Sequence, residues 1–126
     1  MLAPIPFKML QDSAVFMVAE SMGRYQNAAR TQYTQSHVHL QPSSETKKTA
    51  QDTEVVLREV LFVDGSYSTP ALDVTQLQAD SLAVGKPMRV RVTNSHGVFL
   101  GEYEVLTVEA LPDVPATRIH HYELGL

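Results

Sequence analysis

The most reactive side chains of this sequence lie near its end, where two histidines, a phenol and a carboxylate follow one another. They are His120, His121, Tyr122 and Glu123. Successive side chains of a β-strand point to opposite faces, so a strand here would place His120 and Tyr122 on one face. His121 would then share the other face with Ile119 and Glu123. We therefore expect that the two histidines do not chelate one ion together, and that Tyr122 packs with one of them.

A second pair of histidines, His37 and His39, lies two residues apart in a segment that is typical of a strand. Both side chains can then point the same way, as metal ligands do. A metal site would also need a carboxylate or a third histidine, and the sequence marks neither at a set spacing. We expect a solvent or interface role for this pair and no metal site.

A hydrolase could be imagined from Asp64, Ser66 and one of the histidines. The run Asp64-Gly65-Ser66 is ordinary turn chemistry, however, and it lacks the strained Gly-x-Ser-x-Gly elbow of such enzymes. Lys47-Lys48 is the only adjacent basic pair, and no glycine-rich phosphate loop is present. Because no nucleophile, base and orienting group can be assembled, we expect neither enzyme activity nor a cofactor.

Length and composition indicate one folded domain. The chain has 126 residues, of which 44% are hydrophobic and 19% charged, and it contains no cysteine. The absence of cysteine excludes a disulfide framework and fits a reducing or redox-indifferent setting. The formal net charge of −4 argues against a protein that grips nucleic acid through many phosphate contacts. We expect no signal peptide or membrane span in the first ten residues, because they contain no long apolar run.

The first half of the chain predicts a long hairpin followed by a polar segment. Residues 12–20 and 32–42 are typical of two strands, and Pro42 ends the second. Residues 41–53 contain no large apolar residue, which predicts a long, mobile loop. Residues 54–63 are apolar enough for a strand that is buried on both faces, with a turn at Asp64-Gly65-Ser66.

The second half predicts a mostly looped segment over residues 67–83, then a hairpin over residues 88–108 with its turn at Asn94-Ser95-His96-Gly97. A four-residue turn sets Val92 opposite Phe99, and it sets Arg89 opposite Glu102 on the outer face.

The final strand, over residues 117–124, is expected at one edge of the sheet. The predicted fold is all-β: a small single-domain β-barrel of about six strands with long loops. At most a short N-terminal helical turn is expected, around residues 7–10.

The order of these elements, together with several short motifs, resembles a known family. The motifs are Lys8-Met9-Leu10, Pro42-Ser43-Ser44, Leu61-Phe62-Val63-Asp64, Val84-Gly85-Lys86 and, as the most specific one, His120-His121-Tyr122-Glu123-Leu124. Over nearly its whole length the chain is similar to the small minor capsid proteins of tailed phages and prophages of Gram-positive bacteria. These proteins form the head-completion, or stopper, group of head-to-tail connectors.

The resemblance implies a subunit of a homo-oligomeric ring that extends the DNA channel below the portal and adaptor and joins the head to the tail. The implied partners are other copies of the chain, an adaptor or portal-side connector protein, and a tail-terminator or tail-tube protein. Packaged double-stranded DNA would pass through the lumen without sequence-specific binding, and no membrane is involved. The implied location is the neck of the virion, after assembly in the host cytoplasm.

In such connectors a long loop reaches into the channel and helps to retain DNA. The best candidate here is the polar segment of residues 41–53, whose central residues are Ser43, Ser44, Glu45, Thr46, Lys47, Lys48 and Thr49. Residues 66–79 are the rival location. A polar segment without a core of its own can become ordered against its copies in a ring.

The terminal strand is the candidate assembly edge, with residues Ile119, His120, His121, Tyr122 and Glu123. A hypothesis from a different class is a small monomeric β-barrel module that recognises a peptide or another protein along a sheet edge. Self-association separates the two hypotheses, because a connector subunit forms or joins a ring through heterologous contacts.

Overall fold

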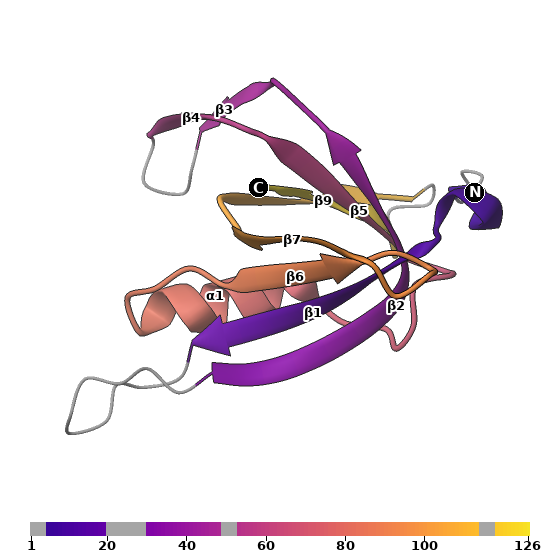
Figure 1. Ribbon diagram of the computed structural model, residues 1–126. Coiled ribbons are helices and arrows are strands. Elements are labelled where there is room, and N and C mark those ends of the chain that lie inside the picture. The colour runs from indigo at the N-terminus through magenta and orange to yellow at the C-terminus, as the bar shows by residue number, and fades with distance from the viewer. Residues whose placement is uncertain (1–4, 20–29, 49–52, 114–117) are drawn as a thin grey trace.

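The structure, a computed structural model, describes residues 5–19, 30–48, 53–113 and 118–126 of the chain. Its strands are β1 (Asp12–Ala19), β2 (Arg30–Pro42), β3 (Thr46–Lys48), β4 (Glu54–Val56), β5 (Glu59–Asp64), β6 (Arg89–Thr93), β7 (Phe99–Glu104), β8 (Thr107–Pro112) and β9 (Ile119–Gly125). The helical elements are a short 3-10 helix, η1 (Phe7–Met9), and one α-helix, α1 (Val74–Ala83). The predicted all-β class and the N-terminal helical turn are confirmed (Figure 1). Neither helix has the length and apolar character needed to cross a bilayer.

Seven strands form one antiparallel sheet in the order β7-β6-β1-β2-β5-β9-β8. The two edge strands, β7 and β8, are consecutive in the chain and are joined only by Val105 and Leu106. Because so short a link connects opposite edges, the sheet has to roll up until the two edges meet at this bend, as Figure 1 shows. The bend switches pairing partners: Val105 N donates to Met88 O at 2.8 Å, and Leu106 N donates to Gly125 O at 2.8 Å.

The expected closed barrel is therefore corrected to a rolled, open sheet. β7 pairs with β6 and β8 pairs with β9, but β7 and β8 share no ladder with each other. Each half of the bent strand thus keeps one unpaired edge. The expectation of about six strands was also too low, because the bend and a small additional hairpin divide the chain into nine strands in its described part.

Helix α1 replaces most of the loop that was expected over residues 67–83. Its N-cap is Asp73, whose side chain accepts a hydrogen bond from Gln76 N at 3.2 Å. Its buried residues are Val74, Gln78 and Ser81, which lie on one helical face. Two of these three are polar, so the apolar stripe that would have predicted a helix is missing from the sequence.

The polar residues of this face form hydrogen bonds with main-chain groups at the ends of the strands. Ser81 Oγ accepts from Ala19 N at 3.0 Å and donates to Lys86 O at 2.6 Å. Gln78 bonds to the main chain of Met88, just before β6, and of Val105, at the bend. The helix is therefore fixed by hydrogen bonds to strand ends as well as by packing, which explains how it forms without an apolar stripe.

The hydrophobic core lies inside the rolled sheet and under α1. Its fully buried members come from all the inner strands and include Phe16, Val38, Leu61, Val63, Met88, Val90, Val92 and Leu124. The β1–β2 hairpin predicted from residues 12–20 and 32–42 is confirmed, and β2 ends at Pro42 as expected. The turn after β5 is confirmed as well.

The β6–β7 hairpin is present, but its register differs from the prediction. Val92 pairs with Gly101 and Thr93 pairs with Phe99, so Leu100 is an extra residue that forms a β-bulge. Phe99 consequently lies opposite Thr93 and is exposed, whereas the prediction set it against Val92. Arg91 takes the place opposite Glu102 that was expected for Arg89, although both guanidinium groups reach Glu102, at 3.0 and 3.2 Å.

Candidate functional site

The polar segment expected to be a mobile loop forms, for the most part, an arm. We define the arm as residues 43–48 and 53–58, which contain β3 and β4. It continues the β2–β5 ladder past the pair Pro42 and Glu59: Ser43 N donates to Arg58 O at 3.0 Å, and Leu57 N donates to Glu45 O at 2.8 Å. The prediction of an unstructured loop was therefore wrong for Thr46–Lys48. Thr49 lies outside the described residues.

The failure of the loop prediction has a physical reason. The segment buries little apolar surface of its own, as expected, but it starts from two strands that are already paired. Extending an existing ladder adds backbone hydrogen bonds without a new long-range closure. The single strand expected over residues 54–63 is divided into β4 and β5 at Leu57 and Arg58. The pairing partner changes there, because β4 pairs with β3 and β5 pairs with β2.

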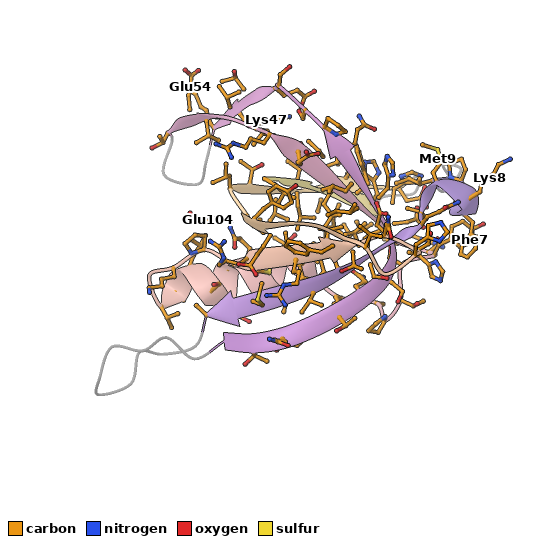
Figure 2. The ribbon with its side chains drawn as sticks, viewed as in Figure 1. Phe7, Lys8, Met9, Lys47, Glu54 and Glu104 are labelled. Carbon is orange, nitrogen blue, oxygen red and sulfur yellow. The ribbon has the colours of Figure 1, made fainter. Side chains whose placement is uncertain are left out.

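Lys47 connects the arm to the edge strand β8. Its Nζ lies 3.0 Å from Glu109 Oε1 and 4.0 Å from Glu45 Oε2. The hydrogen bond to Glu109, followed by the charge of that carboxylate, raises the pKa of Lys47 above its usual value. Figure 2 shows Lys47 and Glu54 on the arm, which projects from the rolled sheet. Both partners of the pair are partly exposed, so it contributes at most about 1 kcal/mol and can open.

Strand β9, the candidate assembly edge, is not an edge strand. It pairs with β5 on one side and β8 on the other, so both rows of its backbone groups are used within the sheet. The residues assigned to this edge, Ile119, His120, His121, Tyr122 and Glu123, belong to the interior of the sheet. The edge is taken instead by β8, because the bend at Val105 and Leu106 brings the chain back alongside β9.

The expected separation of His120 and His121 onto two faces is also wrong. Leu111 pairs with His121 and Pro112 pairs with Ile119, so His120 is the extra residue of a β-bulge. A bulge interrupts side-chain alternation, and the Nδ1 atoms of the two histidines lie 2.8 Å apart. His121 Nε2 is in turn 3.0 Å from Glu123 Oε2. Tyr122 turns towards the core and is buried.

These contacts define a chain of hydrogen bonds when both imidazoles are neutral. The Glu123 carboxylate only accepts, so His121 donates from Nε2 and its Nδ1 becomes an acceptor. His120 then donates from its own Nδ1. These hydrogen bonds order the side chains on one side of the bulge. In the described part of the molecule, no group of three or more possible ligands forms a metal site.

His37 and His39 do not point the same way. His37 is the extra residue of a third bulge, between the pairs Asp12–Val38 and Ser13–Ser36, and its φ is 61°. Its ring lies 4.6 Å from that of Phe7, whereas the ring of His39 lies 6.1 Å from that of Phe62 on β5. The pair therefore has two separate environments, which strand alternation alone did not predict.

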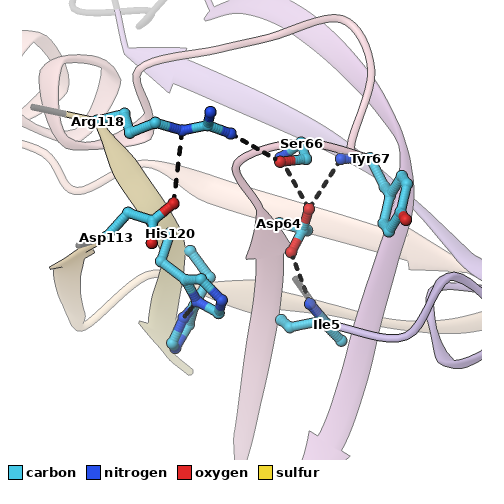
Figure 3. A network of polar contacts seen from close by, with 8 residues as sticks. Ile5, Asp64, Ser66, Tyr67, Asp113, Arg118 and His120 are labelled. Atoms are coloured by element: carbon cyan, nitrogen blue, oxygen red, sulfur yellow. Dashed lines mark hydrogen bonds and ion pairs between the residues drawn. The ribbon is translucent and has the colours of Figure 1, made fainter. Parts of the chain in front are cut away.

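The Asp64 carboxylate bonds to backbone N–H groups of three residues (Figure 3). The carboxylate accepts from Ile5 N at 3.0 Å, Ser66 N at 2.7 Å and Tyr67 N at 2.8 Å. Arg118 extends this network, donating to Ser66 Oγ at 3.1 Å and lying 3.5 Å from Asp113 Oδ2. The network ties the N-terminal segment to the turn after β5 and to the start of β9.

Sequence reasoning missed the most prominent surface, which we name the apolar rim. It consists of the exposed residues Phe7, Met9, Tyr67, Val98, Phe99 and Leu100. Phe99 is the most exposed β7 residue of the rim, at 59%, and β7 has an unpaired edge.

The members of the apolar rim come from three segments that lie towards one end of the sheet. The pairing of Ser13 with Thr93 sets the β6–β7 turn beside the start of β1, just after η1. Figure 2 shows Phe7 and Met9 at this end, and the rings of Phe7 and Tyr67 are 5.4 Å apart. The signal in the sequence was the apolar run Val98-Phe99-Leu100 directly after a turn, in which the predicted register set Phe99 opposite Val92.

Comparison with models of protein families, with curated proteins and with solved structures finds no match for this chain.

Proposed function

We propose that this chain is a structural subunit of a phage head-to-tail connector, which forms a homo-oligomeric ring in the neck of the virion. In this role the ring extends the DNA channel, helps to retain packaged DNA and offers a surface to the tail. The sequence resemblance is the origin of the proposal. The observation that supports it best is the apolar rim beside the unpaired edge of β7.

An exposed apolar surface next to an unpaired strand edge favours a protein partner. Monomeric proteins protect edge strands with charges, prolines or covering loops, since an open edge invites pairing with another chain. Here the first two residues of β7, Phe99 and Leu100, are both exposed and apolar. A ring would cover such a surface on every subunit through the same heterologous contact.

The arm supports the retention of DNA as part of the proposal. It projects from the body of the subunit, and Lys47 forms an ion pair with Glu109 of β8. The β3–β4 part of the arm, which Lys47 ties to β8 by a weak, partly exposed pair, can change position when copies assemble or when DNA passes. The net charge of −4 suits a channel wall that should not hold phosphates tightly.

Native mass spectrometry and negative-stain electron microscopy of the full chain test the ring. We expect ring-sized oligomers from the wild type, and a shift to monomer in the double variant F99S/L100S with an unchanged melting temperature. Val56→Ser is the matched control, because Val56 is 66% exposed but lies on the arm, away from the apolar rim. A wild type that stays monomeric at all concentrations, and is absent from purified virions, would contradict the connector and favour the monomeric binding module.

The arm is tested separately, in assembled particles. Replacing residues 45–56 by Asn-Gly keeps Leu57 and joins the ladder with a two-residue turn. We expect intact rings and filled heads that lose DNA. Particles that keep their DNA would move the retention role to residues 66–79 or to a neighbouring protein.

A further inference from the structure

Two glutamates lie opposite each other on the strands that the arm contacts. Glu109 of β8 pairs with Glu123 of β9, and like charges that are directly opposite in a sheet repel each other. Lys47 of the arm offsets this repulsion, because its Nζ lies 3.0 Å from Glu109 Oε1. The hydrogen bond to Glu109 is the largest cause of the raised pKa of Lys47, and the charge of Glu123 adds to it. The attachment of the arm therefore depends on the charge around both glutamates.

Glu123 has a second partner on its own strand. Residues 121 and 123 point to the same face of β9, and His121 Nε2 is 3.0 Å from Glu123 Oε2. The side chain of His121 is only 17% exposed, and its Nδ1 lies 2.8 Å from Nδ1 of His120. The two glutamates are thus connected to the arm on one side and to a pair of histidines on the other.

This pair of histidines can take up a proton and keep its contacts. When both imidazoles are neutral, one Nδ1 donates and the other accepts; after one proton is added, three of the four ring nitrogens carry hydrogen and one Nδ1 still accepts. The pair can therefore hold a positive charge beside Glu123 with its hydrogen bonds intact. Histidine is the side chain type that ordinarily changes its charge between pH 5 and pH 8.

Other charged or titratable groups lie on every element around the pair. They are Asp64 on β5, Glu109 on β8, Asp113 after β8, Arg118 before β9, His39 on β2, and Glu45 and Lys47 on the arm. Asp64 and Arg118 have partners in the network around the turn after β5. The ring of Phe62 lies 6.2 Å from that of His121 and 6.1 Å from that of His39, on the strand between them. Glu123 is therefore the group that links the histidine pair to the arm.

We propose that the pair His120 and His121 is a pH-sensitive switch for the arm. A proton on the pair places a positive charge next to Glu123, which repels the Lys47 ammonium group and reduces the attraction of the glutamates for it. The arm is therefore held more tightly at pH 8 than at pH 5.5, and its release leaves the pairing of the sheet unchanged. The switch is a property of the single chain; its use in DNA retention rests on the proposed function.

Double-mutant cycles with K47A and E109A test the switch, by urea unfolding of the full chain at one protein concentration, at pH 8 and pH 5.5. Both values lie above the ordinary glutamate value of about 4.3, and low ionic strength limits screening. We expect the coupling, expressed as a ratio of unfolding equilibrium constants, to be roughly 2-fold weaker at pH 5.5. In the His121→Gln background, which keeps an N–H donor for Glu123 but does not titrate, the coupling should be equal at both pH values.

Two controls separate this effect from a general effect of pH. His39→Gln removes a histidine beyond Phe62 and should leave the pH dependence of the coupling as in the wild type. The pair Arg91 and Glu102 should keep its coupling at both pH values, because its hydrogen bonds to arginine hold the pKa of Glu102 below its usual value. Nuclear magnetic resonance of the labelled chain follows the rings, and the Lys47 signals should titrate together with those of His121.

A coupling between Lys47 and Glu109 that is equal at both pH values in the wild type would overturn the switch. So would a coupling that weakens equally in the His121→Gln background, since another group would then be responsible. The outcome is distinguishable from that for the connector: a monomeric chain with the pH effect supports the switch and contradicts the ring, whereas a ring-forming chain without it contradicts the switch alone.

Discussion

Gln78 Nε2 donates to the carbonyl oxygen of Val105 at 2.9 Å, which attaches the middle of α1 to the bend between β7 and β8. The same side chain accepts from Met88 N at 2.8 Å through Oε1, and Val105 N donates to Met88 O. One glutamine thus joins the helix to the bend and to Met88, the residue before β6 that pairs with the bend.

Replacement of Gln78 by leucine should lower the free energy of unfolding by about 2–4 kcal/mol. The variant leaves a buried N–H on Met88 and a buried C=O on Val105 with one partner fewer each, and each such loss costs about 1–3 kcal/mol. Urea unfolding measures the change. Gln76→Leu is the matched control, because Gln76 is exposed on the same helix and bonds only to Asp80 through its side chain. Equal stabilities of the two variants would show that the bend does not depend on Gln78.

Gly65→Ala should lower stability by about 1–3 kcal/mol, the usual cost of forcing atoms into a packed site. A Cβ at this position would collide with the carbonyl oxygen of Ile119, and Gly65 N donates to His120 O at 2.9 Å. The added methyl group therefore pushes the turn away from the bulge of β9. Thermal unfolding checks the effect. Ser66→Ala, one residue later, removes only the exposed hydrogen bond from Arg118 and should lower stability by less than Gly65→Ala does; a Gly65→Ala variant as stable as this control would mean that the turn can shift freely.

The pair Lys47 and Glu109 should show a small, salt-dependent coupling. A double-mutant cycle with K47A and E109A should give about 0.2–1 kcal/mol at low ionic strength, because both side chains are partly exposed. The coupling should fall as salt is raised. The pair Arg91 and Glu102, at 3.0 Å within the β6–β7 hairpin, is the control that does not involve the arm. A coupling near zero at low salt would mean that Glu109 does not hold the arm in solution.

Stability should decrease as the pH rises above about 10, the ordinary tyrosine value. Burial raises the pKa of both Tyr103 and Tyr122, so the folded state holds these protons longer than the unfolded state does. The stabilisation is complete below the unfolded pKa and is lost as the pH rises through the folded pKa. The raised pKa of Lys47 acts in the same direction.

Urea unfolding between pH 8 and pH 11 measures this slope, with the wild type compared with the double variant Y103F/Y122F. The variant should have the shallower slope, because two of the three groups no longer titrate. Val90→Ala serves as a control for lower stability as such, since it weakens the core without removing a phenol. A slope that is the same in wild type and Y103F/Y122F would exclude the two tyrosines as its source.

Several elements could be predicted from local pattern. The β1–β2 hairpin, the turn after β5 and the β6–β7 hairpin follow from apolar runs and turn residues that are close in sequence. The register of the second hairpin could not be predicted, because a bulge at Leu100 has no signature in the composition of the strand. Helix α1 was missed because its buried face carries the polar residues Gln78 and Ser81. These side chains stabilise the helix through hydrogen bonds to backbone groups that are distant in the sequence.

The sequence indicated some segments of the candidate site, but it did not predict their structure or which of them lie together. The sequence drew attention to the polar segment at residues 41–53 and to the histidines of the last strand, and residues 43–48 of this segment belong to the projecting arm. Its hairpin form depends on the pairing of β2 with β5. The apolar rim unites residues more than 90 positions apart, Phe7 and Phe99, so no local pattern could have joined them.

The sequence by itself determined the all-β class, the main turns and the alternation that buries one face of most strands, because these are properties of neighbouring residues. Only the tertiary structure decided which strands are edges, where the bulges fall and which side chains meet. Those features depend on pairings between distant segments, and a single extra residue, such as His37, Leu100 or His120, reverses the side-chain alternation that follows it. The two histidines that alternation assigned to opposite faces are in contact for this reason.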